Sequence, residues 1–538
     1  MKTKRNTSFV KQAMFLSVSG VIVRIIGLLY GIVLTNTIGD LGNGYYSSAY
    51  NIYSIVLMIC SYSIPMAISK IMSEKAAMGE HRIAHRVFQC SLIYVVIVGG
   101  IASLLIFFFA PYIVDVKESA LAMRILAPTI FFSGILSAFR GFFQAQKSVV
   151  PTAVSQLIEQ IFNAFFSVGS AYFLTKIYLD HASEKVTAEY GAAGGAVGTG
   201  FGVLAGLLFL LFVYVVYKPV YRKRLSSGKQ TSITYKETFR IIFLIISPVI
   251  ISTCIYNICT VVDMKFFYGI LEWKDMDTNT IAKLYGIFSR KFFPLANLPI
   301  ALASSMVAAV VPQISMSKAL NDHPAIHHKI HNAVQYSMLF IIPCAFGLAV
   351  LADPIITFLF PNSDNTTYYL LLFGIVYIIF TGLSTVFNGV LQGLGRVDVP
   401  MKNAAISLII HIVVLLPLLI FTELNIYAVL IAISIYALCI TFLNYRAIKK
   451  TSNYIQERKK TFVIPILASG IMSIVVFVVN RIMSYLLANA GKNDRILAGG
   501  ILFVTIPLAA VIYFAIVLKF CFDKEQMKRI PFISKFIR

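Results

Sequence analysis

Several charged and amide side chains lie inside long apolar stretches of this sequence, where they could bind a charged substrate or an ion. Charged groups at the depth of a bilayer are costly, and they usually face a partner or a wet cavity. The candidates are Arg24, Glu159, Asn163, Asp263, Arg290 and Lys291. A guanidinium suits phosphate, because its planar donors can grip two oxygens. The set therefore predicts binding of an anion, with coupling to a proton or another cation through the carboxylates.

Arg24 is the first candidate. It lies 13 residues beyond Lys11, which is roughly 20 Å along a helix. At that depth its side chain does not reach the headgroups comfortably, and an arginine at a helix centre costs at least about 2.5 kcal/mol. Two interpretations stay open, which are binding of a phosphate group and a structural ion pair between helices.

Glu159 and Asn163 belong to a polar stripe in an otherwise apolar segment. Glu159 lies eight residues past Pro151, which is expected to open a helix, and no Lys or Arg occurs in the fifteen residues after Gln160. Asn163 follows Glu159 by one helical turn on the same face. The stripe cannot face lipid. Glu159 is interpreted either as a proton carrier that contacts the substrate or as part of an interhelical hydrogen-bond cluster.

Three further candidates lie later in the chain. Arg290 and Lys291 follow the sequence LYGIFS near the outer third of a span. They either add positive charge to a cavity or extend to the membrane interface. Asp263, in VVDMKFF, could bind Na⁺ through its carboxylate. Pairing with Lys265 or simple hydration is the alternative for Asp263.

Other patterns are interpreted as structural. Glycines at 194, 198, 202 and 206 form an i, i+4 ladder, which predicts close packing of membrane helices and not a dinucleotide-binding loop. His323, His327 and His331 share a helical face and are interpreted as the solvated start of a cytoplasmic helix. The seven cysteines form no CxxC pair, and P-loop, HExxH and nucleophile-elbow motifs are absent. We therefore expect no enzyme, no cofactor and no metal site.

The composition identifies the elements that must position these residues. The chain of 538 residues is 58% hydrophobic and 13% charged, and its mean hydropathy is +0.81. Runs of about 20 apolar residues, each long enough to cross a bilayer, recur along it. The prediction is an all-α polytopic membrane protein with about fourteen transmembrane helices. The expected spans are 10–35, 46–69, 87–110, 121–143, 151–175, 191–217, 241–268, 284–311, 333–352, 367–391, 400–421, 425–445, 461–486 and 496–519.

The formal net charge of +23 is distributed unevenly. Most of the 46 Lys and Arg residues fall in the tails and in the loops that share a side with them. This bias predicts that both termini lie on the cytoplasmic side of the membrane. Basic clusters such as 221–224 then face anionic membrane lipids, and a nucleic-acid partner is not expected.

A repeat at an offset of 248 residues organises the spans. The matched pairs are Phe132 with Phe380, Gly134 with Gly382, Phe139 with Phe387, Gly141 with Gly389 and Gln144 with Gln392. Such a repeat predicts two pseudo-symmetric six-helix lobes of parallel topology, with a substrate site between them. The expected domains are an N-lobe at 1–217, a basic cytoplasmic linker at 218–240, a C-lobe at 241–446, and two further helices with a cytoplasmic tail at 447–538.

Several short phrases in this order resemble a known family. They are RIIG at 24–27, IPMAISK at 64–70, RGFFQ at 140–144, PTAVSQLIEQ at 151–160, PLANLPIAL from 294 and VVPQIS ending at 315. Together they resemble the oligosaccharide flippases of the multidrug/oligosaccharidyl-lipid/polysaccharide superfamily, in the branch of stage V sporulation protein B and the lipid II flippases. The likeness extends over essentially the whole chain.

The resemblance implies a flippase that moves an undecaprenyl-pyrophosphate-linked oligosaccharide, either lipid II or a polysaccharide repeat unit, from the inner to the outer leaflet. It implies alternating access, lobes arranged as a V, a lipid tail held by the last two spans, and a role in cell-wall or polysaccharide synthesis and sporulation. Arg24 matches the arginine of the family's R-x-x-G motif. Tyr30 stands where many members have a second cation, and His411 where they have an asparagine that helps to bind Na⁺.

Two other functions stay open beside this one. A drug or cation antiporter of the same superfamily would need a cavity dominated by carboxylates and aromatic rings. A membrane-embedded glycan polymerase or transferase would need large polar loops. The expected partners are a lipid-linked glycan, anionic lipids and enzymes of cell-wall or polysaccharide synthesis, and the chain is expected to act as a monomer driven by membrane potential or an ion gradient.

Overall fold

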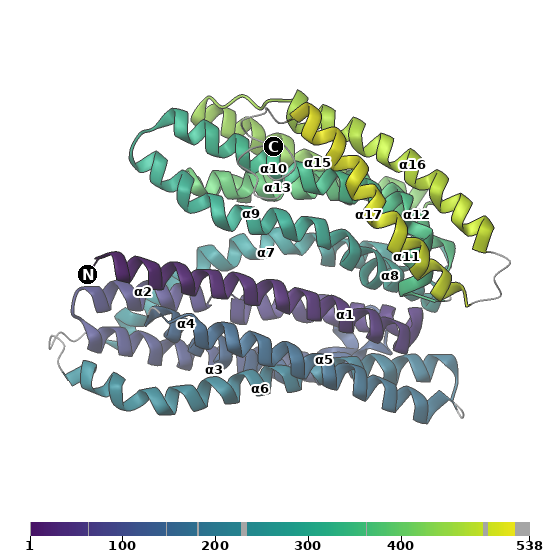
Figure 1. Ribbon diagram of the computed structural model, residues 1–538. Helices are drawn as coiled ribbons and strands as arrows, with labels where there is room; N and C mark the ends of the chain where they lie inside the picture. Colours follow the sequence, from purple (N-terminus) through teal and green to yellow (C-terminus); the bar gives the residue numbers. More distant parts are fainter. Residues whose placement is uncertain are drawn as a thin grey trace. The chain divides into compact units, whose positions relative to one another are not determined.

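The computed structural model describes residues 2–62, 64–146, 148–179, 182–226, 234–361, 363–487 and 493–521 (Figure 1). Every regular element among these residues is a helix, and none of them forms a strand. The chain divides into two compact units, Met1–Arg290 (unit 1) and Lys291–Arg538 (unit 2). The all-α membrane fold predicted from the composition is confirmed.

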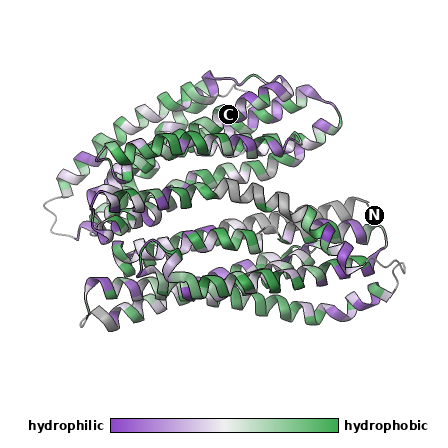
Figure 2. Ribbon diagram, turned by 180° about the vertical axis from the view of Figure 1, so that it is seen from behind, coloured by the Kyte–Doolittle hydropathy of each residue, from purple (hydrophilic) through white to green (hydrophobic). Residues whose placement is uncertain are grey.

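The described residues contain 12 helical segments that are long and apolar enough to cross a membrane, compared with about fourteen expected. One difference arises because the first two expected spans follow each other without a loop and count as a single segment, Ile22–Ser61. The other is the expected span at 241–268, which includes side chains at 245–257 that fall outside the description. Figure 2 shows hydrophobic residues along the middle of the helices and hydrophilic residues concentrated near their ends, as a bilayer requires.

Unit 1 contains the first eight α-helices and one π-helical segment. They are α1 (Lys2–Leu57), η1 (Met58–Tyr62), α2 (Ile64–Ala77), α3 (His81–Ile113), α4 (Ser119–Ala145), α5 (Val150–Leu179), α6 (Glu184–Ser226), α7 (Tyr235–Trp273) and α8 (Thr278–Ile287). A second π-helical segment, η2 (Phe288–Phe292), follows α8 directly. Unit 1 therefore extends well beyond the expected linker at 218–240.

Helix α1 is broken at Gly39, which adopts φ 69° and ψ 176°. This backbone conformation is open to glycine and strained for other residues. The break frees backbone carbonyls, and the Asn43 amide donates to two of them, the oxygens of Thr35 (3.0 Å) and Gly39 (2.7 Å). The chain thus bends from the first expected span into the second without an intervening loop.

The glycine ladder lies where α6 packs against α5. A Cβ atom added to Gly198 would lie 2.1 Å from Ser167 Oγ, and one added to Gly194 would lie 2.6 Å from Ala171 Cα. At Gly202 the same atom would lie 2.5 Å from the carbonyl oxygen of Glu159. The two backbones approach each other at these points because the glycines have no side chains, so the predicted helix packing is confirmed.

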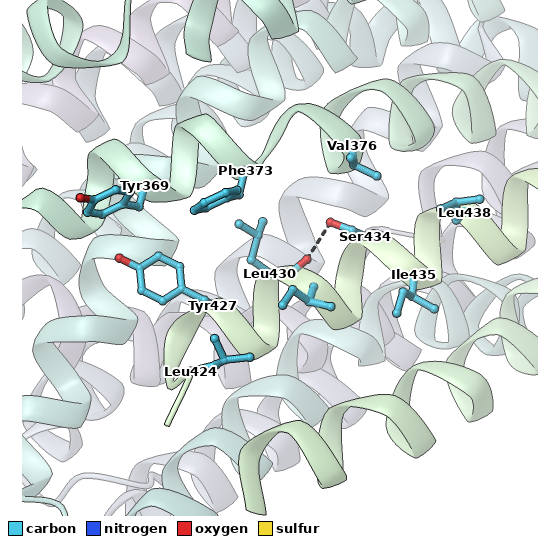
Figure 3. Close-up of a pocket in the computed structure, with 10 residues that line it drawn as sticks. Tyr369, Phe373, Val376, Leu424, Tyr427, Leu430, Ser434, Ile435 and Leu438 are labelled. Atoms are coloured by element: carbon cyan, nitrogen blue, oxygen red, sulfur yellow. Dashed lines mark hydrogen bonds between the residues drawn. The ribbon is translucent and has the colours of Figure 1, made fainter. Parts of the chain in front are cut away.

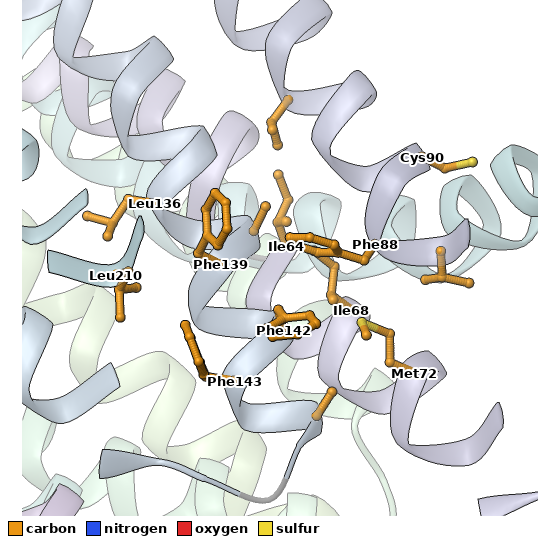
Figure 4. Packing of buried hydrophobic residues seen from close by; sticks show 14 of the residues in the cluster. Ile64, Ile68, Met72, Phe88, Cys90, Leu136, Phe139, Phe142, Phe143 and Leu210 are labelled. Atoms are coloured by element: carbon orange, nitrogen blue, oxygen red, sulfur yellow. The ribbon is translucent and has the colours of Figure 1, made fainter. Parts of the chain in front are cut away.

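Aromatic rings form a core beside the C-terminal end of α4 (Figure 4). Phe142 is fully buried, and its ring centroid lies 4.8 Å from Phe88 on α3 and 5.0 Å from Tyr221 on α6. Phe143 of the RGFFQ phrase and Phe139, which directly precedes the phrase, are buried in the same cluster. Three phenylalanines thus anchor this stretch of α4, which fixes the direction of the intervening Arg140.

Unit 2 contains the remaining helices. They are α9 (Phe293–Ala319), α10 (His323–Val350), α11 (Ala352–Leu359), α12 (Asn365–Phe373), α13 (Ile375–Gly393), α14 (Asp398–Phe421), α15 (Ile426–Ser452), η3 (Lys459–Val463), α16 (Ile464–Leu487) and α17 (Asp494–Cys521). The last two helices pack against α10, where the buried Tyr513 hydroxyl donates to the carbonyl oxygen of Leu339 at 2.8 Å.

One repeated glycine pair has the same kind of neighbour in each unit. On α4, an added Cβ at Gly134 would lie 3.3 Å from Val95 of α3. On α13, an added Cβ at Gly382 would lie 2.6 Å from Ile341 of α10. These paired contacts support the proposed repeat, in which α3 and α4 correspond to α10 and the α12–α13 segment.

Candidate functional site

Glu159 has a cationic partner on the neighbouring helix. Its Oε2 atom lies 2.5 Å from Nη2 of Arg140, and the two side chains are 27% and 14% exposed. Arg140 Nε also donates to the Ser155 hydroxyl at 3.1 Å. The absence of Lys and Arg in the fifteen residues after Gln160 did not exclude this partner, because Arg140 precedes Glu159 by 19 positions. The sequence does contain a signal for this pair, because Arg140 and Glu159 have opposite charges and lie on the two helices that the α4–α5 turn connects.

Asn163 continues the polar stripe towards α1 and α6. Its amide donates to the Tyr30 hydroxyl at 3.3 Å, and its Oδ1 accepts from Ser167 at 2.9 Å. Ser167 also donates to the carbonyl oxygen of Gly195 at 2.8 Å. These are the contacts that an interhelical hydrogen-bond cluster requires, and they join α5 to both neighbours.

The ion pair yields the first prediction. Glu159→Gln should lower the free energy of unfolding by about 1–3 kcal/mol, because Arg140 loses a charged hydrogen-bond partner. The pH dependence of transport should stay unchanged. Thermal unfolding of the purified protein and transport at several pH values are the measurements. Arg140→Gln combined with Glu159→Gln should recover part of the loss, since neither charge is then left alone. A flattened pH profile would instead identify Glu159 as a proton carrier.

Arg24 lies on α1 with an exposed side chain. It precedes Tyr30 by six residues, or roughly 9 Å of helix. Between them, an added Cβ at Gly27 would lie 3.1 Å from Gln160 Nε2, so α5 packs on α1 just beyond Arg24. Gln160 of α5 thus contacts α1 within one helical turn of Arg24.

Arg290 is held against an aromatic ring within unit 1. Its guanidinium carbon lies 4.6 Å from the centroid of the Tyr46 ring. Neither its Nε nor its Nη2 is exposed, and among the described residues neither atom has a hydrogen-bond partner. A cation–π contact uses the face of the guanidinium and leaves its N–H groups available. Arg290 therefore offers two free donors at its edge.

The neighbouring residues bring α1 and α8 into backbone contact. An added Cβ at Gly44 would lie 2.1 Å from the carbonyl oxygen of Ala282, and one at Gly286 would lie 2.4 Å from that of Asp40. Three side-chain hydrogen bonds cross the same contact: Ser289 to Ser47 (2.6 Å), Tyr45 to Asn279 (2.6 Å) and Asn51 to Tyr285 (2.9 Å). The contact fixes the start of η2 and, with it, the position of Arg290.

Ion pairs join helices at the end of unit 1 that the charge bias places outside the cell. Lys265 of α7 lies 2.6 Å from Asp115, and Lys283 of α8 lies 2.8 Å from Glu184 of α6. Burial raises the pKa of the Asp115 carboxyl, and the hydrogen bond and charge of Lys265 offset part of that rise. These pairs link α7 and α8 to the helices that precede them in the chain.

The other two candidates have contacts of their own. In unit 2, Lys291 is 5% exposed, and its ammonium donates to the Ser363 hydroxyl at 2.9 Å. In unit 1, Asp263 is 4% exposed, and its Oδ2 lies 3.8 Å from the Cys259 sulfur. Of the predicted residues, Glu159 and Asn163 lie on one face of α5, and Asn163 contacts α1 through Tyr30. Arg290 also contacts α1, because its guanidinium stacks on Tyr46 of that helix.

The histidine face begins a helix, as expected. His323 is exposed at the first position of α10, and the Asp322 carboxylate caps that helix by accepting from Ala325 N at 3.0 Å. His327 Nε2 lies 2.6 Å from the carbonyl oxygen of Ser452. His327 therefore joins α10 to the end of α15.

Two apolar hollows lie apart from the predicted charges. The one in unit 2 has a volume of about 620 Å³ and lies between α12, α13 and α15, with the rings of Tyr369 and Tyr427 at one end (Figure 3). The one in unit 1 has a volume of about 610 Å³ and lies between α1 and α5. None of the predicted site residues lines either hollow, although Tyr30, which bonds to Asn163, does line the second.

Comparisons with known sequences cover the chain almost completely. The family model described as "Polysaccharide biosynthesis protein" matches residues 9–318, and the MatE model matches residues 291–416. The chain is 24% identical to stage V sporulation protein B of Bacillus subtilis (strain 168) over 540 residues, which is 98% of this chain and 99% of that protein. It is 22% identical to the lipid II flippase MurJ of the same organism, over 87% of each chain.

Solved structures with the same fold are membrane transporters. The lipid II flippase MurJ in an inward closed conformation aligns with a TM-score of 0.68 and 17% identity, over 98% of this chain and 100% of that one. An inward-facing multidrug resistance MATE family transporter aligns with a TM-score of 0.64 and 14% identity, over 82% and 99% of the two chains. At these identities the likeness establishes the fold.

Proposed function

Because this chain belongs to the polysaccharide biosynthesis protein family, of the multidrug/oligosaccharidyl-lipid/polysaccharide superfamily, we propose that it flips an undecaprenyl-pyrophosphate-linked oligosaccharide to the outer leaflet. Its relatives are flippases and transporters, and its 12 candidate membrane spans make it a multi-pass membrane protein. The cargo is either lipid II or a polysaccharide repeat unit, and it moves by alternating access.

The observation that carries the proposal is the state of Arg290. Its guanidinium is held on Tyr46 at 4.6 Å, and its Nε and Nη2 atoms are buried with no hydrogen-bond partner among the described residues. Leaving buried donors unsatisfied costs about 1–3 kcal/mol, and a bound anion that accepts from them would remove this cost. A pyrophosphate has the charge and the paired oxygens to do so.

Membrane potential supplies the driving force in this proposal. A pyrophosphate carries about two negative charges, and an inside-negative potential favours outward movement of each by about 2.3 kcal/mol per 100 mV. Export of the head group therefore gains roughly 4.6 kcal/mol per 100 mV without ATP. The direction rests on the charge bias, which places both termini in the cytoplasm.

Transport of a drug or another organic cation is the second candidate function. The MatE match over residues 291–416 and the alignment with a multidrug resistance transporter favour it. A cation site needs carboxylates that are free to meet the ligand. Glu159 is instead paired with Arg140, and the two buried unpartnered donors of Arg290 suit an anion.

The second prediction tests the cationic residues. Arg24→Ala and Arg290→Ala should each weaken binding of the lipid-linked glycan roughly ten- to a hundredfold, because a charge-assisted hydrogen bond contributes about 1.5–3 kcal/mol. Arg24→Lys should restore only part of the activity, since an ammonium lacks paired donors. The measurement is delivery of lipid-linked glycan to the outer leaflet in cells depleted of other flippases, at equal expression.

Arg481 provides the matched control. It is an exposed arginine on α16 whose guanidinium stacks on Phe477, with 5.3 Å to the ring centroid. Arg481→Ala should leave delivery unchanged. Full delivery by the Arg24 and Arg290 variants would show that both arginines are packing residues.

A further inference from the structure

We propose that Tyr46 is a positioning residue, which holds the Arg290 guanidinium on its ring so that the unpartnered N–H groups are presented to an anion. The inference rests on the proposed function, in which Arg290 contacts the pyrophosphate. Tyr46 itself was not among the residues that the sequence pointed to, because a tyrosine in an apolar span is usually a packing residue.

The Tyr46 ring is fixed on both sides by other groups. It is 2% exposed, and it stacks on Tyr50 one helical turn away, with 5.5 Å between the ring centroids and 17° between their planes. On α6, an added Cβ at Gly195 would lie 3.3 Å from the ring carbon Cδ2. The ring therefore rests against a stretch of backbone that has no side chain, and it cannot tilt without displacing α6 or Tyr50.

A hydrogen bond between neighbouring residues of α1 and η2 holds the guanidinium at this ring. Ser47 follows Tyr46, Ser289 precedes Arg290, and the two serine hydroxyls lie 2.6 Å apart. Ser289 and Arg290 belong to η2, and a π-helical turn widens the helix and redirects its side chains. Two consecutive side-chain contacts, Ser47 with Ser289 and Tyr46 with Arg290, thus set the register of α1 against η2.

The chemistry of the stack explains why a tyrosine serves here and a carboxylate would not. An acidic partner would occupy the guanidinium N–H groups and cancel the charge. An aromatic face holds the same cation through its flat surface and leaves the edge free. In agreement with such a stack, the Nε and Nη2 atoms of Arg290 are buried and have no hydrogen-bond partner among the described residues.

The third prediction compares three substitutions in the full-length protein. The probe is undecaprenyl pyrophosphate without a glycan, and its dissociation constant is measured in detergent. Tyr46→Phe keeps the ring and should bind within about twofold of the parent. Tyr46→Leu removes the ring and should weaken binding by about 2- to 30-fold, the range for a cation–π contact. In an Arg290→Gln background, Tyr46→Leu should have no further effect. Equal weakening in both backgrounds would overturn the proposal.

A second measurement needs no ligand. The rate at which phenylglyoxal modifies Arg290 is followed by mass spectrometry, with Arg481 in the same sample as the internal reference. Tyr46→Leu should change the Arg290 rate at least severalfold and leave the Arg481 rate unchanged, and Tyr46→Phe should change neither. An unchanged Arg290 rate would overturn the proposal. A changed rate with no effect of Arg290→Gln on probe binding would uphold the positioning and refute the pyrophosphate role of Arg290.

Discussion

A disulfide between residues 47 and 289 is expected to stop transport completely, and a reducing agent is expected to restore it. The Ser47 and Ser289 hydroxyl oxygens lie 2.6 Å apart, so the double variant Ser47→Cys/Ser289→Cys places two sulfur atoms within reach of a bond of about 2.05 Å. The substitutions are nearly isosteric, and the fold around them should be kept.

We expect this complete loss because the contact between α1 and α8 has to open during the proposed transport cycle. The internal repeat predicts that α7 and α8 begin the second lobe. In alternating access, the lobes must separate on the outer side for cargo to leave. Here α8 lies against α1 with Gly44 and Gly286 in backbone contact, so in the proposed cycle we expect this contact to open.

The measurement is outer-leaflet delivery before and after oxidation, with cross-linking followed by mass spectrometry. Ser47→Cys and Ser289→Cys alone serve as controls and should transport normally under oxidant. Normal transport by a fully cross-linked protein would show that α1 and α8 move as one body.

The largest loss of stability is expected from Gly198→Leu. An added Cβ there would lie 2.1 Å from Ser167 Oγ and 2.2 Å from Ser167 N. Backbone atoms cannot move aside as a flexible side chain can, so the α5–α6 contact must separate. Overpacking of a tight core costs about 1–3 kcal/mol and sometimes more, and we expect Gly198→Leu to exceed this range. The yield of folded protein from membranes and its unfolding temperature are the measurements.

Gly169 on α5 offers the matched control for this substitution. An added Cβ at Gly169 would meet no atom within 4 Å, and alanine is a better helix former than glycine. Gly169→Ala should therefore leave the yield unchanged or raise it slightly. A normal yield from Gly198→Leu would mean that α5 and α6 do not pack as closely as described.

The parts of the fold that depend on periodic patterns were predictable from the sequence. Apolar runs of about 20 residues and the four glycines of α6 report local requirements, which are the thickness of a bilayer and the closeness of one helix pair. The number of spans was less predictable. A bend at Gly39 replaces the expected first loop. Asn43 donates to the carbonyl oxygen of Gly39 at this bend, but nothing in the sequence distinguishes it from other polar residues.

The candidate site was only partly predictable, because its contacts join residues far apart in the chain. Arg24, Asp263 and Lys291 remain predictions as substrate or ion ligands. Arg140 was missed because its charge pairs across a helix turn, and Tyr46 because it lies 244 positions before the arginine that it holds. The division into lobes at 218–240 also remains a proposal. Helix α8 packs on α1 so closely that the compact unit ends at Arg290.

The ion pairs at the outer end of unit 1 have a consequence for the habitat of the cell. Lys265 with Asp115 and Lys283 with Glu184 are partly exposed, and at physiological ionic strength dissolved ions screen charges beyond about 8 Å. The ionic strength around a cytoplasmic ion pair is held constant by the cell, whereas these pairs, in the orientation that the charge bias predicts, face the water that surrounds the cell. Higher salinity weakens them and lower salinity strengthens them. In the proposed transport cycle, the ease of outward opening would thereby depend on a property of the environment that the cell does not control.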